Sequence, residues 1–297
     1  MNLKNILSEI GQTDPEVYEQ PKDRRQLLKT FGAKVAVASL PFAASTLFSN
    51  KASAKKTDVT PVQVLNFILE LEYLAYNFYH TANNVGIGGP APLIPTADQA
   101  GFLTIEGHKR AHIIYLNSLI ISLGGTPYTP TNYNPTAANP YFVVSGAYDF
   151  TAGGLYPLVF SDYPTFTMIA VTFEDTFIHG YLGQLQYSLS NTMLQAQLMQ
   201  LQCVVARDAA YVRLVRRFLG YAAAPEHPAP WITNNIPPIA SLQPYYNTED
   251  DTIQEGIDIL SLPGYSGTTP QISATAAFDE PFDQTTVIGL LAGFILS

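Results

Sequence analysis

The chain of 297 residues is 47% hydrophobic and only 13% charged, which supplies enough apolar material for a large core and excludes a disordered protein. Its net charge of −9 argues against a nucleic-acid-binding protein, and its one cysteine excludes a disulfide framework and a CxxC-type metal site. We expect no permanent membrane span, because no stretch of 18 uncharged apolar residues occurs.

The first 54 residues have the order of an export signal. Arg24 and Arg25 precede a mostly apolar run, and Ala-Ser-Ala follows at residues 52–54. Paired arginines, an apolar region and an Ala-x-Ala cleavage site are typical of a twin-arginine signal. An ordinary amphipathic helix is the alternative, which Lys34 within the apolar run favours. We predict a twin-arginine-type signal over residues 1–54 and a protein that is periplasmic or otherwise exported.

Removal of this segment makes the chain more acidic. Seven of the 15 basic residues and five of the 24 acidic ones lie in it, so residues 55–297 carry a net charge of −11. Nucleic acids and anionic lipid surfaces are therefore unfavourable partners. No transmembrane anchor is expected to remain after cleavage.

Four segments have the apolar spacing of amphipathic helices. Thr60 and Pro61 predict the start of the first, with threonine as the N-cap and proline in the first turn. Thr-x-x-Gln at residues 96–99 predicts a capping box at the start of the second. The third is predicted to begin near Pro164, and the fourth to follow a short turn at residues 188–191.

Polar residues interrupt the apolar stripe of each predicted helix near its centre. The interruptions are Glu72 in the first helix, His108, Lys109 and His112 in the second, Glu174 in the third and Asp208 in the fourth. One isolated buried carboxylate would be costly. Four polar groups at matching depth are therefore expected to meet inside a bundle.

The lengths of the connections predict the topology. The links over residues 83–95 and 188–191 are short and suit antiparallel neighbours, whereas the link over residues 126–163 is long enough to run the length of a bundle. One long crossover between two helix pairs is the ferritin-like arrangement. We predict an all-α fold with a ferritin-like four-helix bundle over residues 55–222.

Residues 223–297 differ in character from the bundle. They contain many prolines, Trp231 and an acidic run at residues 249–251, and a last apolar helix is predicted over residues 285–296. We interpret this extension as a wrap that packs on the bundle, with the final helix covering one side. Its tyrosine, asparagine, threonine and proline content would also suit a binding surface.

Several helix motifs match a known family. They are Leu65-Asn66-Phe67, Leu71-Glu72-Tyr73-Leu74 and Phe78-Tyr79 in the first helix, Tyr181-Leu182-Gly183 in the third, and Ala206-Arg207 with Ala209-Ala210-Tyr211 in the fourth. With the acidic lead before Arg24-Arg25, they resemble exported ferritin-like domain proteins related to plant desiccation-related proteins, of the type found in Bacteroidota. The resemblance covers nearly the whole chain.

The resemblance implies a di-metal site with a Glu from the first and third helices and a Glu-x-x-His from the other two. The ligands that remain at matching positions are Glu72, His112, Glu174 and, in place of the second histidine, Asp208. Lys109 and Val205 replace the two glutamates that would bridge the metals. Two divalent ions about 3.5–4 Å apart need bridging anions. We therefore predict a degenerate site with no cofactor or a single divalent iron or manganese ion.

Two central side chains give sharper expectations. Lys109 is predicted to point into the bundle and to pair with Glu72, Glu174 or both. Asp208 is predicted to be buried and to accept a hydrogen bond from Lys109 or Tyr115.

Other polar residues have simpler interpretations. His108 and His112 are one turn apart but lack an HExxH motif, so His108 is interpreted as a helix-surface histidine. Asp175 and His179 are expected to form a local pair on the outer face of the third helix. Cys203 is expected to be a small buried side chain. Arg213, Arg216 and Arg217 suit the negative end of the fourth helix.

Together these features predict an exported ferritin-like bundle protein with a non-catalytic stress-related or interaction role. An iron- or manganese-binding oxidoreductase or ferroxidase using the remaining ligands is one alternative. A component of an envelope assembly is another, with the crossover and the extension as its binding surfaces. A homo-oligomer or an envelope protein is the expected partner.

Overall fold

The structure is a computed structural model, and it describes residues 59–86, 91–133, 142–188, 191–220, 229–254, 256–263 and 270–296. The predicted signal segment and the predicted boundary between the bundle and the extension lie outside these residues.

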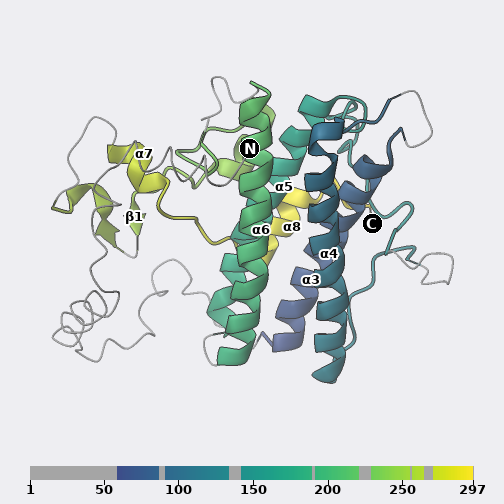
Figure 1. Ribbon diagram of the computed structural model, residues 1–297. Helices are drawn as coiled ribbons and strands as arrows, with labels where there is room; N and C mark the ends of the chain where they lie inside the picture. The colour runs from purple at the N-terminus through teal and green to yellow at the C-terminus, as the bar shows by residue number, and fades with distance from the viewer. Residues whose placement is uncertain are drawn as a thin grey trace, which may run out of the picture. The chain divides into compact units, whose positions relative to one another are not determined.

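Four long helices form a bundle (Figure 1). They are α3 (Pro61–Asn84), α4 (Thr96–Ser122), α5 (Tyr163–Ser188) and α6 (Thr192–Phe218). α3 packs against α4 and α5, and α6 packs against α5 and α4. The long crossover joins α4 to α5, so the predicted all-α, ferritin-like four-helix arrangement is confirmed.

The starts of α3 and α4 differ in their caps. At α3, the Thr60 hydroxyl accepts from the Gln63 amide at 3.2 Å, and the Gln63 side chain accepts from the Thr60 amide at 2.8 Å. The capping box predicted at Thr96 is wrong, because Thr96 is already helical and a proline without a side-chain acceptor precedes it. Gln99 instead donates to the carbonyl oxygen of Ile94 at 3.0 Å.

α5 is buried along almost its whole circumference, as expected of a helix that is apolar all round. Besides its neighbours in the bundle, α5 packs against α8 (Gln284–Leu291), drawn in yellow in Figure 1, and against the 3₁₀ helix η2 (Ala240–Tyr246). A Cβ atom on Gly183 would lie 1.8 Å from the Phe282 carbonyl oxygen. The extension therefore packs on the bundle through α8 and lies directly against the backbone of α5.

The remaining elements of the extension are short. They are the antiparallel strands β1 (Ile253–Gln254) and β2 (Ile257–Asp258), the 3₁₀ helix η3 (Ile259–Ser261) and α7 (Pro270–Thr275), which packs against η3. Within the described part of the chain, none of the helices is both long enough and apolar enough to cross a membrane.

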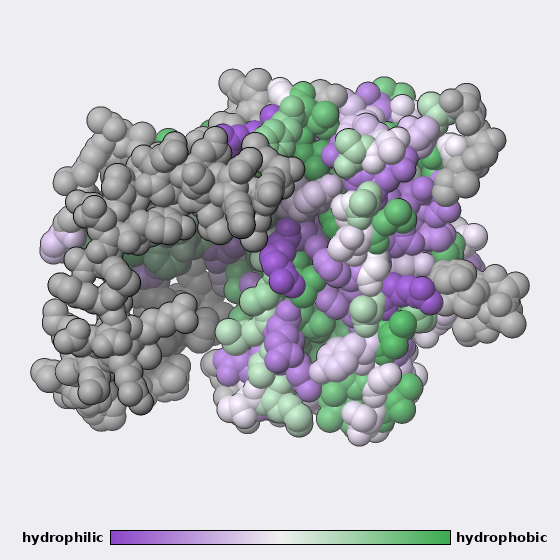
Figure 2. Space-filling view, in the orientation of Figure 1, coloured by the Kyte–Doolittle hydropathy of each residue, from purple (hydrophilic) through white to green (hydrophobic). Residues whose placement is uncertain are grey.

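The outer surface of the bundle mixes residue types. Figure 2 shows hydrophilic and hydrophobic residues interspersed over the face that carries α4 and α6. Exposed apolar side chains on these helices include Leu103, Ile114, Met193 and Phe218. Apolar residues scattered in this way need no binding partner to explain them.

Candidate metal centre

The polar residues predicted to meet do lie together inside the bundle. Their exposed fractions are 2% for Glu72, 0% for Lys109, 7% for His112, 0% for Glu174 and 3% for Asp208. Each residue interrupts the apolar face of its helix, so packing of the four faces brings the polar groups to the bundle centre. The sequence therefore placed all of them correctly in depth.

Lys109 occupies the centre of the network. Its Nζ lies 2.6 Å from Glu174 Oε2 and 3.3 Å from Asp208 Oδ2. The predicted pairing of Lys109 with Glu174 is confirmed, as is the predicted burial of Asp208. Burial acts to lower the pKa of Lys109, but the negative charges of Glu174 and Asp208 outweigh it and raise that pKa. Lys109 is therefore an ammonium ion at neutral pH.

Glu72 has partners of its own. Its Oε1 lies 3.1 Å from His112 Nδ1 and accepts a hydrogen bond of 2.7 Å from the Tyr181 hydroxyl. Burial acts to raise the pKa of Glu72, but His112 and the charge of Lys109 prevail and lower it. Lys109 thus influences Glu72 through its charge rather than through an ion pair.

Asp208 has a partner that sequence reasoning missed. His108 Nδ1 lies 2.9 Å from Asp208 Oδ1, whereas Tyr115, one of the two expected donors, is 39% exposed. The side chain of His108 is 37% exposed, as expected of a helix-surface histidine, but it also contacts this buried carboxylate, which was not expected. His108 and Lys109 are adjacent on α4 and contact the two oxygens of Asp208 separately.

Two tyrosines complete the centre in a crossed arrangement. Glu72 and Tyr79 on α3 are seven residues apart, and so are Glu174 and Tyr181 on α5. Tyr181 donates to Glu72. The buried Tyr79 hydroxyl has no hydrogen-bond partner among the described residues, and burial together with the charge of Glu174 raises its pKa. The repeated Glu-x₆-Tyr spacing is the sequence signal that identifies both tyrosines.

The residues at this centre do not fit a di-metal site. The ammonium of Lys109 lies between Glu174 and Asp208. A metal ion bound by these two carboxylates would need the same position. Val205 is wholly buried and offers no ligand atom. Burial and the charge of Asp208 raise the pKa of Glu174, and the charge of Lys109 opposes them.

The prediction that Asp175 and His179 pair on the outer face of α5 is wrong. Asp175 and His179 are both buried and do not pair with each other. Asp175 is ion-paired with Arg213 and accepts a 2.9 Å hydrogen bond from the Tyr246 hydroxyl. His179 Nε2 lies 2.6 Å from Glu249 Oε1. The physical reason is the extension, which covers the face of α5 that the bundle pattern alone leaves open.

Two residues on α6 also differ from expectation. Cys203 is exposed rather than buried. Arg216 is buried, and its guanidinium donates to the Pro164 carbonyl oxygen at 3.2 Å and to Thr167 Oγ1 at 3.1 Å. Arg216 therefore joins α6 to the start of α5 and does more than balance the charge at a helix end.

Comparison with known proteins agrees with this architecture. A family model described as a ferritin-like domain matches residues 60–217, which span all four bundle helices and more than half of the chain. A comparison with curated proteins gave no match. The motifs, the topology and this match together show that the chain belongs to the ferritin-like domain family.

Proposed function

We propose that this chain is an exported ferritin-like bundle whose centre is a buried charge network in place of a di-metal site. Its role is then non-catalytic, as a stress-related or interaction protein of the cell envelope. One observation carries the proposal, which is the wholly buried Lys109 ammonium between Glu174 and Asp208.

The charge network accounts for the retained carboxylates without a metal. Burying two charges has a large desolvation cost, and the attraction between them offsets that cost only when the geometry of the pair is good. Lys109 meets this condition with two carboxylates at 2.6 and 3.3 Å. A metal ion entering this position must displace an ammonium whose pKa its neighbours raise.

Support for export comes from the sequence alone. Arg24 and Arg25, the apolar run and the Ala-x-Ala site at residues 52–54 stand in the order of a twin-arginine signal. Mass spectrometry of the native protein is expected to show a mature chain that begins near Lys55. An intact first residue on most of the periplasmic pool would contradict cleavage.

An iron- or manganese-dependent oxidoreductase is the second candidate function. Two buried carboxylate oxygens favour it, because Glu72 Oε2 and Glu174 Oε1 accept no hydrogen bond from the described residues. In this case the metal would have to be held through these two oxygens, because Lys109 already contacts Glu174 Oε2 and Asp208 Oδ2.

Elemental analysis of protein from iron- and manganese-replete medium separates the two functions. We expect the Glu72→Gln variant to contain as much metal as the wild type, because the central site holds none. Lys109→Glu is expected to gain divalent metal that the further change Glu72→Gln removes. Arg207→Glu, an exposed neighbour of Asp208, is the matched control and should gain none.

The opposite pattern would overturn the proposal. A wild-type protein that contains stoichiometric iron or manganese and loses it on Glu72→Gln has a working central metal site. Because the readout depends on Glu72, metal bound elsewhere in the chain does not affect the conclusion.

A further inference from the structure

Three segments of the chain meet around His179, outside the bundle centre. His179 belongs to α5, Glu249 follows η2, and Asp279 precedes α8. One ligand atom of each residue lies within 4.8 Å of the other two. The fold therefore assembles one imidazole nitrogen and two carboxylates from parts of the sequence that are far apart.

The imidazole of His179 is oriented for ligation. Its Nδ1 lies 2.5 Å from the backbone carbonyl oxygen of Glu280, which can only accept, so Nδ1 carries a hydrogen. The ring also stacks on Phe282, with centroids 4.5 Å apart. Nε2 then faces the carboxylate of Glu249 at 2.6 Å. Metal-binding histidines are commonly held in this way, with one ring nitrogen donating to a carbonyl and the other facing the ion.

The cluster has more carboxylates than cations to neutralise them. Glu249 is 1% exposed, and its Oε2 accepts no hydrogen bond from the described residues. Glu280 Oε2 is also buried and accepts no hydrogen bond from the described residues. Lys109 is the only lysine in the described ranges, and it is engaged at the bundle centre.

We propose that His179, Glu249 and Asp279 bind a single divalent transition-metal ion, for which zinc and manganese are suitable probes. Imidazole nitrogen and carboxylate oxygen together suit first-row divalent ions, and three protein ligands leave further positions for water. The ion takes the place of the proton between His179 Nε2 and Glu249. Because the ligands come from α5 and from two segments of the extension, the ion fastens the extension to the bundle.

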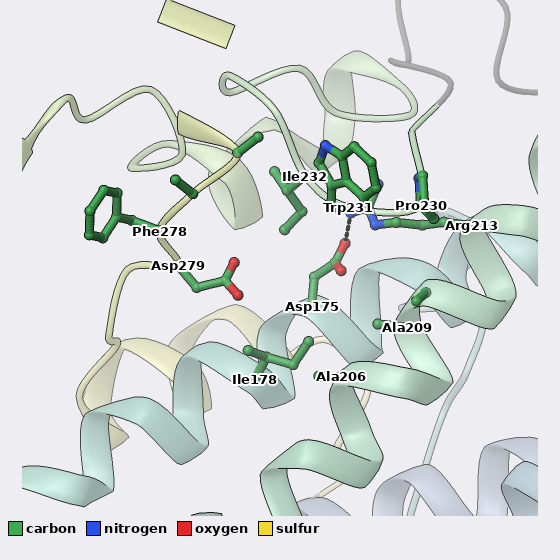
Figure 3. A pocket seen from close by; sticks show the side chains of 13 residues that line it. Asp175, Ile178, Ala206, Ala209, Arg213, Pro230, Trp231, Ile232, Phe278 and Asp279 are labelled. Carbon is green, nitrogen blue, oxygen red and sulfur yellow. Dashed lines mark hydrogen bonds and ion pairs between the residues drawn. The ribbon is translucent and has the colours of Figure 1, made fainter. Parts of the chain in front are cut away.

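One of the three ligands is open to solvent. Asp279 is exposed, and with Asp175 it lines a pocket of about 310 Å³ between α5, α6 and the extension. Figure 3 shows the carboxylates of Asp175 and Asp279 facing the interior of this pocket, with Trp231 and Ile232 on its opposite side. Asp175 is ion-paired with Arg213, so Asp279 is the ligand that a hydrated ion meets first.

Isothermal titration of the purified full chain tests the site. The protein is stripped with EDTA, dialysed and titrated separately with zinc chloride and manganese chloride. We expect one ion per chain in the wild type and a loss of affinity of more than about tenfold for Asp279→Ala, since even outer-shell changes cost about 10–100-fold. Asp279 is exposed, so this variant is expected to fold.

Three further variants make the test specific. Asp250→Ala removes an exposed carboxylate next to Glu249 and should bind as the wild type does. Glu72→Gln should also bind normally, because it changes only the bundle centre. His179→Gln should lose binding as Asp279→Ala does. A wild type that binds neither ion, or equal affinity in the wild type and Asp279→Ala, would overturn the proposal.

Discussion

The bundle centre and the cluster under the extension both contain buried carboxylates and a histidine, but they differ in the cation beside those carboxylates. At the centre, Lys109 lies between Glu174 and Asp208 and takes the position of a cation. Under the extension, one ligand atom each of His179, Glu249 and Asp279 lies within 4.8 Å of the other two, and the described chain places no lysine there. On our two proposals, the buried ammonium of Lys109 is what distinguishes the cluster without a metal ion from the cluster that binds one. Position in a ferritin-like bundle alone does not decide it.

The largest expected effect is at Lys109. Lys109→Met leaves Glu174 and Asp208 without their cation, and breaking a buried pair from one side costs about 3–5 kcal/mol. Urea unfolding at pH 7 measures this loss. Arg207→Met, an exposed position on α6, serves as the control and should change the free energy of unfolding by less than about 0.5 kcal/mol. An unchanged stability in Lys109→Met would show that the network contributes nothing.

A smaller effect is expected at Tyr181. Tyr181→Phe removes the 2.7 Å hydrogen bond to buried Glu72 and leaves His112 as the contact of that oxygen. Hydrogen bonds to charged groups contribute about 1.5–3 kcal/mol, and we expect a loss in this range in the same unfolding experiment. The exposed Tyr115→Phe is the matched control. Equal stabilities of the two variants would contradict the role given to Tyr181.

The metal-free cluster under the extension should make stability depend on pH. Burial acts to lower the pKa of His179, but the hydrogen bond and the charge of Glu249 outweigh burial and raise that pKa from 6.5 to about 9. A raised histidine pKa adds stability that is full below pH 6.5 and is lost as the pH rises through about 9. The pKa of Glu280 is also raised, so its titration likewise lowers the stability as the pH rises. The charges of Asp175 and Asp279 also act on this cluster.

Unfolding in EDTA between pH 6 and 9.5 measures this dependence. We expect the free energy of unfolding to fall over this interval, with a slope of up to about 1.4 kcal/mol per pH unit for each proton lost. His179→Gln should lose part of that slope. A stability that rises with pH in the wild type, or an identical slope in the variant, would contradict the expectation.

The smallest effect is expected at Asp279 in the absence of metal. Its side chain is exposed, so Asp279→Ala should change the stability of EDTA-treated protein by less than about 0.5 kcal/mol. Thermal unfolding measures it beside the wild type. A large loss of stability without metal would mean that Asp279 has a structural role unrelated to ion binding.

The sequence predicts the bundle well because its signals are local. Helix period, the Thr60 cap and the paired glycines after α4 all depend on neighbours in the chain, and they locate the helices closely. Lys109 could also be predicted, because its place in the stripe of α4 puts it at the depth of Glu174. The partner of a central residue is harder to predict, as His108 shows, because it depends on the rotation of two helices about their axes.

The site under the extension could not be predicted in the same way. His179 and Asp175 look like an exposed pair when only the bundle pattern is considered, since the residues that bury them lie far along the chain. Glu249 belongs to an acidic run that reads as a solvated loop, yet it is 1% exposed. Such contacts depend on how the extension crosses α5, which no periodic signal in residues 223–297 specifies.

The cover of α5 by α8 has a consequence for biosynthesis. The four bundle helices are complete at Phe218, but α8 begins only at Gln284. Earlier parts of a chain leave the ribosome first, and domains fold as units. A nascent chain that has emerged only to the end of α6 still exposes an apolar side of α5. We expect it to need chaperone protection until α8 emerges, so a translocation route that accepts only folded proteins would pass the chain only after its last helix has docked.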